Sequence, residues 1–285
     1  MLHFVTDYQK HSTLRESFFK LARKTFGINL KTWYEQGNWT DSYVPCSIAE
    51  DDQVVANVSV NHMNFLYHGM PKKAIQLGTV MTDPTYRGQG LSRRLIEKVS
   101  QEYSKQCDFI YLFANRAVLD FYPLFGFHRV LEFTHSKRFV RPPSPLSVRK
   151  LDLSRPDDKE LLLHLTNDPL PVSSISMLDG QPLLLFYLCS EYRDNLYLIG
   201  ESVLAVAEYQ GDTLFLADLF SQRPFLFDQV VGALLTKDEM QVVFGFTPVN
   251  NAAYEIKEIM DDDEALFILP RVEWQNERFP ILSHT

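Results

Sequence analysis

The residues best suited to chemistry lie in one short turn, Tyr86-Arg87-Gly88-Gln89-Gly90-Leu91-Ser92, between an apolar strand that ends at Thr82 and a helix. The first turn of a helix has backbone N–H groups without an intrahelical acceptor, and the positive end of the helix dipole lies behind them. Gly88 and Gly90 let the main chain approach phosphate oxygens closely, and Arg87 adds a positive charge. The turn therefore predicts an anion site suited to a pyrophosphate.

Two further motifs follow the next apolar strand, namely Asn115 and Tyr122-Pro123-Leu124-Phe125-Gly126-Phe127. Together with Arg87-x-x-Gly90-x-Ser92, they resemble the GCN5-related N-acetyltransferase (GNAT) family. The family turn runs Arg/Gln-x-x-Gly-x-Gly/Ala, and its later motif is Asn, six residues, then Tyr-x-x-x-Gly-Phe. The resemblance is strong over 74–134 and only topological over the second half. It implies an α/β fold with a mixed sheet whose central strands splay apart.

The resemblance also implies that the chain binds acetyl-CoA as a cosubstrate, needs no metal, and transfers the acetyl group directly to an amine. The pantetheine arm would pair with the free edge of Val80–Thr82, as extended peptides pair with sheet edges. Asn115 would hydrogen-bond the arm, and a backbone N–H near Thr82 would stabilise the oxyanion. The residues expected to bind the coenzyme are Val80, Met81, Thr82, Arg87, Gly88, Gln89, Gly90, Leu91, Ser92, Arg93 and Asn115.

Proton transfer requires an acid and a base. Tyr122 is the expected general acid, because a tyrosine with its reference pKa of about 10 stays protonated at neutral pH. Pro123 disfavours a helical backbone at Tyr122, which would change the aim of its hydroxyl. The base has no motif of its own: His62 on the long strand is one candidate. The carboxylate of Thr285 is another, by resemblance to tandem members of the family that use the terminal carboxylate.

Hydrophobic periodicity and turn residues predict the elements that position these groups. In the first half we expect helices over 13–26, 30–36 and 90–104, and strands over 43–48, 54–67, 75–82 and 109–113. Two closing strands, 127–133 and 135–140, would complete the unit. The second half repeats this order in weakened form, with a helix near 250–260 and a strand over 266–270, which is typical of an internal duplication.

A proline-rich linker over 142–146 divides the chain into a catalytic GNAT domain, 1–141, and a second domain, 147–285. In the second domain the corresponding turn is Ser221-Gln222-Arg223-Pro224, which has no glycine. Without glycine the backbone cannot approach a pyrophosphate at low cost. We therefore predict that 147–285 is a degenerate GNAT-like domain that binds no coenzyme.

Charge is distributed unevenly along the 285 residues. Residues 1–145 carry 18 Lys and Arg against 13 Asp and Glu, whereas residues 146–285 carry 10 against 23. A basic first half suits an anionic coenzyme, and an acidic second half argues against nucleic acid and favours a cationic partner. The absence of a long apolar run argues against a membrane span. Three widely spaced cysteines and the lack of a secretory signal predict a cytoplasmic protein.

These observations favour an acetyl-CoA-dependent N-acetyltransferase that acts on a primary amine of a small, cationic molecule. Two alternatives remain open. The chain could be a non-catalytic acyl-CoA-binding regulatory module, since the turn at Arg87–Ser92 permits binding without transfer. It could also acetylate a protein amine. The sequence leaves monomer and homodimer equally open.

Overall fold

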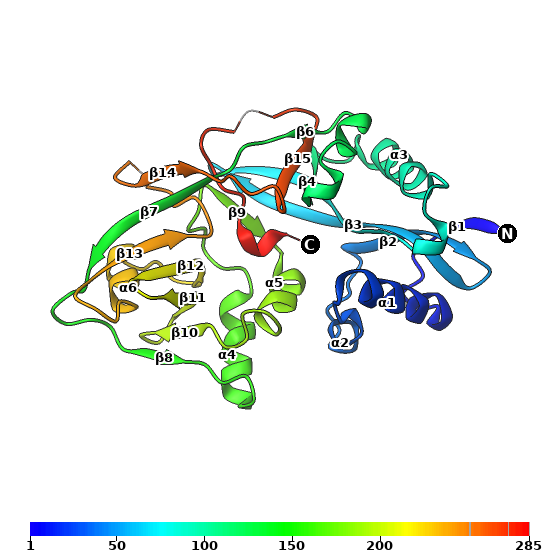
Figure 1. Ribbon diagram of the computed structural model, residues 1–285. Helices are drawn as coiled ribbons and strands as arrows, with labels where there is room; N and C mark the ends of the chain where they lie inside the picture. Colours follow the sequence, from blue (N-terminus) through cyan, green and yellow to red (C-terminus); the bar gives the residue numbers. More distant parts are fainter. Residues whose placement is uncertain (251, 273, 285) are drawn as a thin grey trace.

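Two mixed sheets lie next to each other in the computed structural model, which describes residues 1–250, 252–272 and 274–284. Figure 1 shows them joined by β7 and by the returning C-terminal segment. The first sheet contains, in spatial order, β1 (Leu2–Thr6), β2 (Tyr43–Glu50), β3 (Gln53–Tyr67), β4 (Met70–Thr82), β5 (Phe109–Ala114), β15 (Ala265–Leu269) and β6 (His128–Arg129), with β9 (Ile175–Leu178) paired to β3. The second contains β14 (Glu255–Glu258), β7 (Phe133–Val140), β13 (Glu239–Phe244), β12 (Thr213–Phe220), β11 (Val203–Gln210), β10 (Leu196–Ile199) and β8 (Val148–Lys150).

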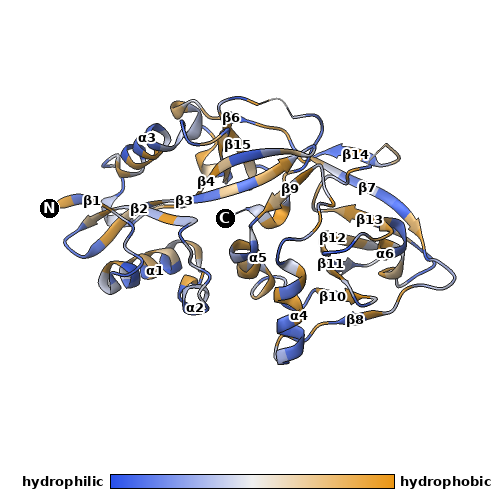
Figure 2. Ribbon diagram, turned by 180° about the vertical axis from the view of Figure 1, so that it is seen from behind, coloured by the Kyte–Doolittle hydropathy of each residue, from blue (hydrophilic) through white to orange (hydrophobic). Residues whose placement is uncertain are grey.

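Helices cover both faces of the first sheet, as Figure 1 shows. They are α1 (Ser12–Phe26) and α2 (Leu30–Glu35) on one face and α3 (Leu91–Tyr103) on the other, with short 3-10 turns η1 (Pro84–Tyr86), η2 (Arg116–Val118) and η3 (Tyr122–Phe125). Polar and apolar residues alternate along α1 and α3 in Figure 2, because each helix buries only one side. In α1 the buried side carries Leu14, Phe18 and Leu21, and Gly27 ends the helix with a φ of 74°. These elements match the sequence-based predictions to within a few residues.

The second sheet packs against α4 (Pro156–Thr166), α5 (Gln181–Leu188) and the short α6 (Phe227–Ala233), and the chain ends with η4 (Ile281–Ser283). The turn from β12 to α6 contains no glycine, as the sequence shows. Figure 1 places the C-terminal end between the two sheets, close to α5. In the described ranges, none of the helices combines the length and the apolar character that crossing a membrane requires.

The central strands β4 and β5 separate soon after they meet. Their parallel pairing is confined to three pairs, the last of which joins Gln76 to Tyr111. Beyond that point β4 continues to Thr82 and β5 to Ala114 without pairing to each other. A register shift against β3 falls at the same stretch, where Thr79 adopts a φ of 43°. The expected splayed strands are therefore present, and the splay begins at a defined pair.

The two sheets exchange strands, which the sequence did not predict. The segment 135–140 was expected to close the first sheet, but β7 pairs with β13 and β14 of the second. The vacated place is taken by β15 from the end of the chain, which pairs with β5 and β6. The pattern of a strand encodes which face is buried but not which partner it meets. Each sheet therefore contains at least one strand from the other half of the chain.

The helix expected near 250–260 is also wrong. Within the described residues this stretch contains the edge strand β14, which pairs antiparallel with β7 from Glu255 to Glu258. All four of its residues are exposed, so no apolar face is available to stabilise a helix there. The second half therefore does not repeat the order of elements of the first half at this position.

Candidate functional site

The turn that is predicted to bind an anion faces open space at the start of α3. Asp83 begins the turn by accepting the backbone N–H of Thr85 at 3.0 Å. Gly88 and Gly90 then adopt φ values of 76° and 72°, a left-handed backbone that strains other residue types. A Cβ added at either glycine would meet no atom within 4 Å, so the space in front of the turn is open.

The amides of this turn have no competing partners. Among the described residues, no backbone or side-chain acceptor faces the N–H groups from Gly88 to Arg93, and Arg94 is the first to donate back, to Gly90 at 3.1 Å. The Ser92 hydroxyl lies 2.7 Å from that of Thr82 and joins the helix to the end of β4. Unsatisfied amides at the positive end of a helix bind anions, so this turn can hold a pyrophosphate.

A groove of about 810 Å³ leads from this turn into the gap between β4 and β5. Every residue predicted to bind the coenzyme borders it except Gln89. The edge of β4 that faces β5 is unpaired beyond Gln76, so its backbone groups are available to an extended ligand. The Nε of Arg87 lies 3.4 Å from the carbonyl of Thr82. Arg93 packs over the ring of Phe125 and lies 3.8 Å from Glu97.

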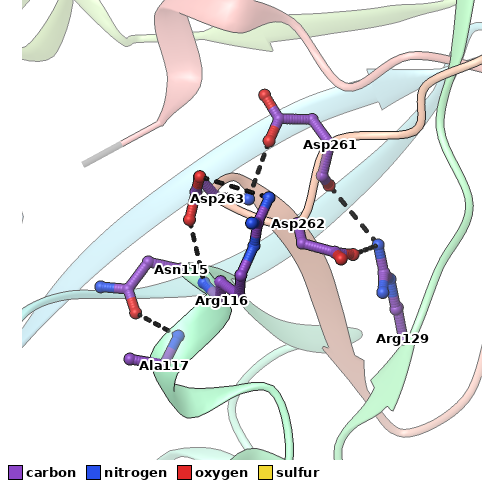
Figure 3. Close-up of polar contacts among 7 residues, drawn as sticks. All are labelled: Asn115, Arg116, Ala117, Arg129, Asp261, Asp262 and Asp263. Atoms are coloured by element: carbon purple, nitrogen blue, oxygen red, sulfur yellow. Dashed lines mark hydrogen bonds and ion pairs between the residues drawn. The ribbon is translucent and has the colours of Figure 1, made fainter.

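Asn115 caps the turn that follows β5. Its Oδ1 accepts the backbone N–H of Ala117 at 3.1 Å, and its amide nitrogen has no hydrogen-bond partner among the described residues. Figure 3 shows how this turn is held by the loop before β15. The backbone N–H of Arg116 donates to Asp263 at 3.3 Å, and Arg129 pairs with Asp262 at 2.8 Å. The strand from the end of the chain thus supports the rim of the groove.

Tyr122 borders the groove and is only 5% exposed. It opens the 3-10 turn η3, in which Pro123 occupies an early position, so Pro123 shapes a tight turn and not an α-helix. Among the described residues its hydroxyl has no hydrogen-bond partner, and its ring packs against Phe121 and Phe267. Burial raises the pKa of Tyr122 to about 12, so the hydroxyl stays protonated at neutral pH.

A buried polar network holds the irregular stretch of β4 in place, and no sequence motif predicted it. The amide nitrogen of Asn57 donates to the carbonyl of Thr79 at 3.0 Å and to the hydroxyl of Ser59 at 2.9 Å. Its oxygen accepts the hydroxyl of Ser47 at 2.8 Å. Tyr43 completes the network, since Ser59 donates to its hydroxyl at 2.8 Å. The only possible signal was the row of polar side chains at alternate positions on a buried strand.

A second cavity, of about 440 Å³, lies on the α1–α2 side of the first sheet. It shares Phe26 and Thr79 with the groove predicted to hold the coenzyme, so the two hollows meet at the irregular stretch of β4. Its far wall comes from the second half, between Leu178 and Glu191. The indole N–H of Trp33 donates to the carbonyl of Pro182 at 2.8 Å and fixes this wall to α2.

His62 borders this cavity, but its ring packs edge-on against Tyr103 at the end of α3. Side chains alternate along a strand, so His62 lies on the α3 face while Asn61 and Met63 lie on the other. The sequence could place His62 on the correct strand but could not decide its face. This orientation disfavours His62 as the base.

The end of the chain reaches the point where β4 and β5 separate. The carbonyl of Ser283 accepts hydrogen bonds from Gln76 at 2.9 Å and from the hydroxyl of Tyr111 at 3.2 Å. The ring of His284 stacks on Phe113, with 3.5 Å between ring centroids, and Tyr187 donates to its carbonyl. Thr285 lies outside the described residues, so its expected role stays a prediction.

Parted parallel strands, a glycine turn whose amides lack partners among the described residues, and an adjoining cavity form an arrangement that could hold an extended anionic ligand next to a second molecule. A model of the acetyltransferase (GNAT) domain matches residues 11–130. This stretch is therefore similar to an acetyltransferase (GNAT) domain, and the acyltransferase class predicted from its motifs is confirmed. A search of curated proteins found no match.

Solved structures share the fold over nearly the whole chain. One is a conserved protein of unknown function from Enterococcus faecalis, described as a probable N-acyltransferase, with a TM-score of 0.62 at 13% identity over 94% of this chain and 72% of that one. Another is a GCN5-related N-acetyltransferase from Kribbella flavida, with a TM-score of 0.56 at 13% identity over 94% and 70%. A third, from Anabaena variabilis, gives 0.54 at 15% identity over 93% and 72%. At these identities the likeness concerns the fold alone.

Proposed function

We propose that this protein is an acetyl-CoA-dependent N-acetyltransferase that acts on the primary amine of a small, cationic molecule. One observation carries the proposal: the coenzyme groove and the second cavity meet at Thr79, beside the gap between β4 and β5. A thioester in the groove and an amine in the cavity would therefore approach each other at this junction. Holding two reactants in such proximity is a major source of catalysis.

The residues present suit acetyl-CoA. The free amides of 88–92 and the charge of Arg87 would hold the pyrophosphate. The unpaired edge at Val80–Thr82 and the amide nitrogen of Asn115 would hold the pantetheine arm. Free backbone N–H groups on this edge would also stabilise the oxyanion of the reacting carbonyl.

In the reaction, the amine nitrogen forms a bond to the acetyl carbon as the carbon–sulfur bond breaks. The nitrogen loses one proton, and the sulfur takes one as the coenzyme leaves. Tyr122 is suited to supply that proton, because it borders the groove, has no hydrogen-bond partner among the described residues and remains protonated.

The cavity favours a small, positively charged acceptor. Asp179 and Glu191 are exposed residues on its border, where they would attract an ammonium group. The hydrogen bond between Trp33 and Pro182 closes the wall between the two halves. An open groove for a polypeptide would need this wall to part, so a small molecule is favoured over a protein amine.

The test measures thermal unfolding with and without acetyl-CoA, together with release of free coenzyme A in the presence of simple primary amines. Saturation at about 100 times the dissociation constant adds roughly 2.7 kcal/mol of stability. Gly90→Asp should abolish this gain for two reasons. The new carboxylate would repel the phosphate expected at this place, and aspartate would be strained in the left-handed backbone that Gly90 adopts. Gly211→Asp is the matched control, since Gly211 has a φ of 61° in an equally open turn of the second half.

Binding with amine-dependent release of coenzyme A, both lost in Gly90→Asp and kept in Gly211→Asp, would support the proposal. Binding without release on any amine would favour the non-catalytic acyl-CoA-binding module. The absence of binding in the native protein would overturn both.

A further inference from the structure

We propose that the acceptor is an elongated di- or polyamine, in which one amine reacts beside Thr79 while Asp179, at the far end of the second cavity, binds a second ammonium group. This inference rests on the proposed function and names the substrate class of the same site. It comes from the positions of the two carboxylates on the border of that cavity and from their lack of basic partners.

Asp179 and Glu191 are the acidic residues on the border of the second cavity, and both are exposed. Elsewhere in the second half a carboxylate can have a basic partner, as in Asp158, which lies 2.8 Å from a guanidinium nitrogen of Arg149. Among the described residues, neither Asp179 nor Glu191 has such a partner, and the described lining of the cavity contains no Lys or Arg. Both carboxylates are therefore available to a cationic ligand.

The two carboxylates lie at opposite ends of α5. Asp179 precedes this helix and Glu191 follows it, and eight residues of α-helix are about 12 Å long. Tyr187 in the last turn donates to the carbonyl of His284, whose ring stacks on Phe113 at the rim of the groove predicted to hold the coenzyme. The end of α5 near Glu191 therefore faces the gap between β4 and β5, and Asp179 lies farther from the gap.

The strand register gives the length that such an acceptor has to span. Gly78, next to Thr79, pairs with Ser59 of β3. Leu178, the residue before the distal carboxylate, pairs with Asn64 of the same strand. From position 59 to position 64 a strand rises about 17 Å. A short diamine such as 1,4-diaminobutane cannot reach both ends of the cavity, whereas 1,8-diaminooctane can when the reach of the aspartate side chain is included.

The walls between the two ends suit an apolar chain. Leu183 and Phe186 of α5 border the cavity together with Trp33 and Met63 of the first half. The volume of about 440 Å³ falls in the range of small-molecule sites. Such walls gain free energy by removing methylene groups from water. An acceptor with an apolar middle and a second ammonium at its end therefore matches both the walls and the exposed carboxylate.

The test compares amines of equal chain length by kcat/KM for release of coenzyme A from acetyl-CoA. We expect 1,8-diaminooctane to be favoured over octylamine by about fivefold, which is the upper range for an ion pair at an exposed carboxylate. In contrast, 1,4-diaminobutane should be no better than butylamine, because its second ammonium stays in the apolar part of the cavity. The preference for the long diamine should shrink as salt is added, because salt screens an exposed ion pair.

Three substitutions locate the second ammonium. Asp179→Asn removes the charge, keeps the side-chain shape and tolerates the φ of 53° at this position, so the preference should disappear. Asp168→Asn is the matched control, since Asp168 is exposed with a φ of 52° but lies outside the cavity, and the preference should be unchanged. Glu191→Gln should lower the use of both amines alike, because Glu191 lies at the end where the amine reacts. The stabilisation by acetyl-CoA reports that each variant is folded.

A preference for the long diamine that is lost in Asp179→Asn and kept in Asp168→Asn would support the inference. Transfer to octylamine and 1,8-diaminooctane with equal efficiency would overturn it and leave the proposed function intact. A preference that survives in folded Asp179→Asn, or that is lost only in Glu191→Gln, would also contradict it. Transfer to no amine at all would instead overturn the proposed function.

Discussion

The side-chain amide of Gln76 donates to the backbone carbonyl of Ser283 at 2.9 Å, across 207 positions of sequence. Gln76 belongs to the last pair that joins β4 to β5, so this bond secures the end of the chain where the two strands part. Both residues are fully buried. The gap between the strands is therefore bounded by the last turn of the chain as well as by its own sheet.

Replacing Gln76 by Leu tests this link. The variant keeps the side-chain volume but leaves the Ser283 carbonyl with only the hydroxyl of Tyr111. We expect a loss of about 1 kcal/mol in the free energy of unfolding, measured by urea denaturation. Turnover should fall further than stability accounts for, because the bond lies at the pair where β4 and β5 part. Gln241→Leu, on a strand of the second sheet and without a side-chain hydrogen bond among the described residues, should change neither.

Tyr122→Phe separates catalysis from binding. The hydroxyl has no partner to lose among the described residues, so stability and the gain from acetyl-CoA should be unchanged. If Tyr122 donates the proton to sulfur, kcat should fall by about 10²–10⁴-fold. Because its pKa is about 12, the native enzyme should show no loss of this acid below about pH 11. Tyr103→Phe is the control, since Tyr103 has a similarly raised pKa but borders neither hollow.

Asn57→Ala tests the network that holds the irregular stretch of β4. It removes bonds to Ser47, Ser59 and Thr79 from a buried position and should destabilise the protein by about 2–3 kcal/mol. Thr79 would then lose its positive-φ geometry, and we expect kcat to fall with little change in acetyl-CoA binding. Asn195→Ala, which removes one bond to Glu208, should cost about 1 kcal/mol or less and leave kcat unchanged. An unaltered kcat in folded Asn57→Ala would show that the network has no role in catalysis.

His284 should make stability depend on pH. Burial lowers its pKa to about 3, and the charge of Arg278 adds to the effect. Below pH 6.5 the unfolded chain takes up a proton on this ring and the folded chain does not, so stability falls as the pH is lowered. The loss can reach about 1.4 kcal/mol per pH unit. In His284→Phe this contribution should vanish, so the native protein and the variant should diverge between pH 6.5 and 4 in denaturation curves.

The structural features that could be predicted from the sequence are those set by residues close together in the chain. The turn at Arg87–Ser92, the helix after it and Tyr122 at the groove all follow from residues close together in the chain, whose backbone preferences act locally. Even in this part of the chain, the sequence could not predict which face of β3 carries His62, because a histidine fits either side of a half-buried strand. The alternating polar residues that begin at Asn57 can be seen in the sequence. Their role is clear only from the structure, in which the amide nitrogen of Asn57 donates to the carbonyl of Thr79.

The sequence by itself therefore determined the glycine turn, the main helices and strands between residues 13 and 113, and the acyltransferase class. Only the tertiary structure decided that β7 and β15 change places between the sheets, that Ser283 meets Gln76, and that Leu178–Glu191 walls the second cavity. The physical reason is the same in each case. Strand pairing and cavity walls depend on contacts between distant segments, and an alternating apolar pattern specifies burial without specifying the partner.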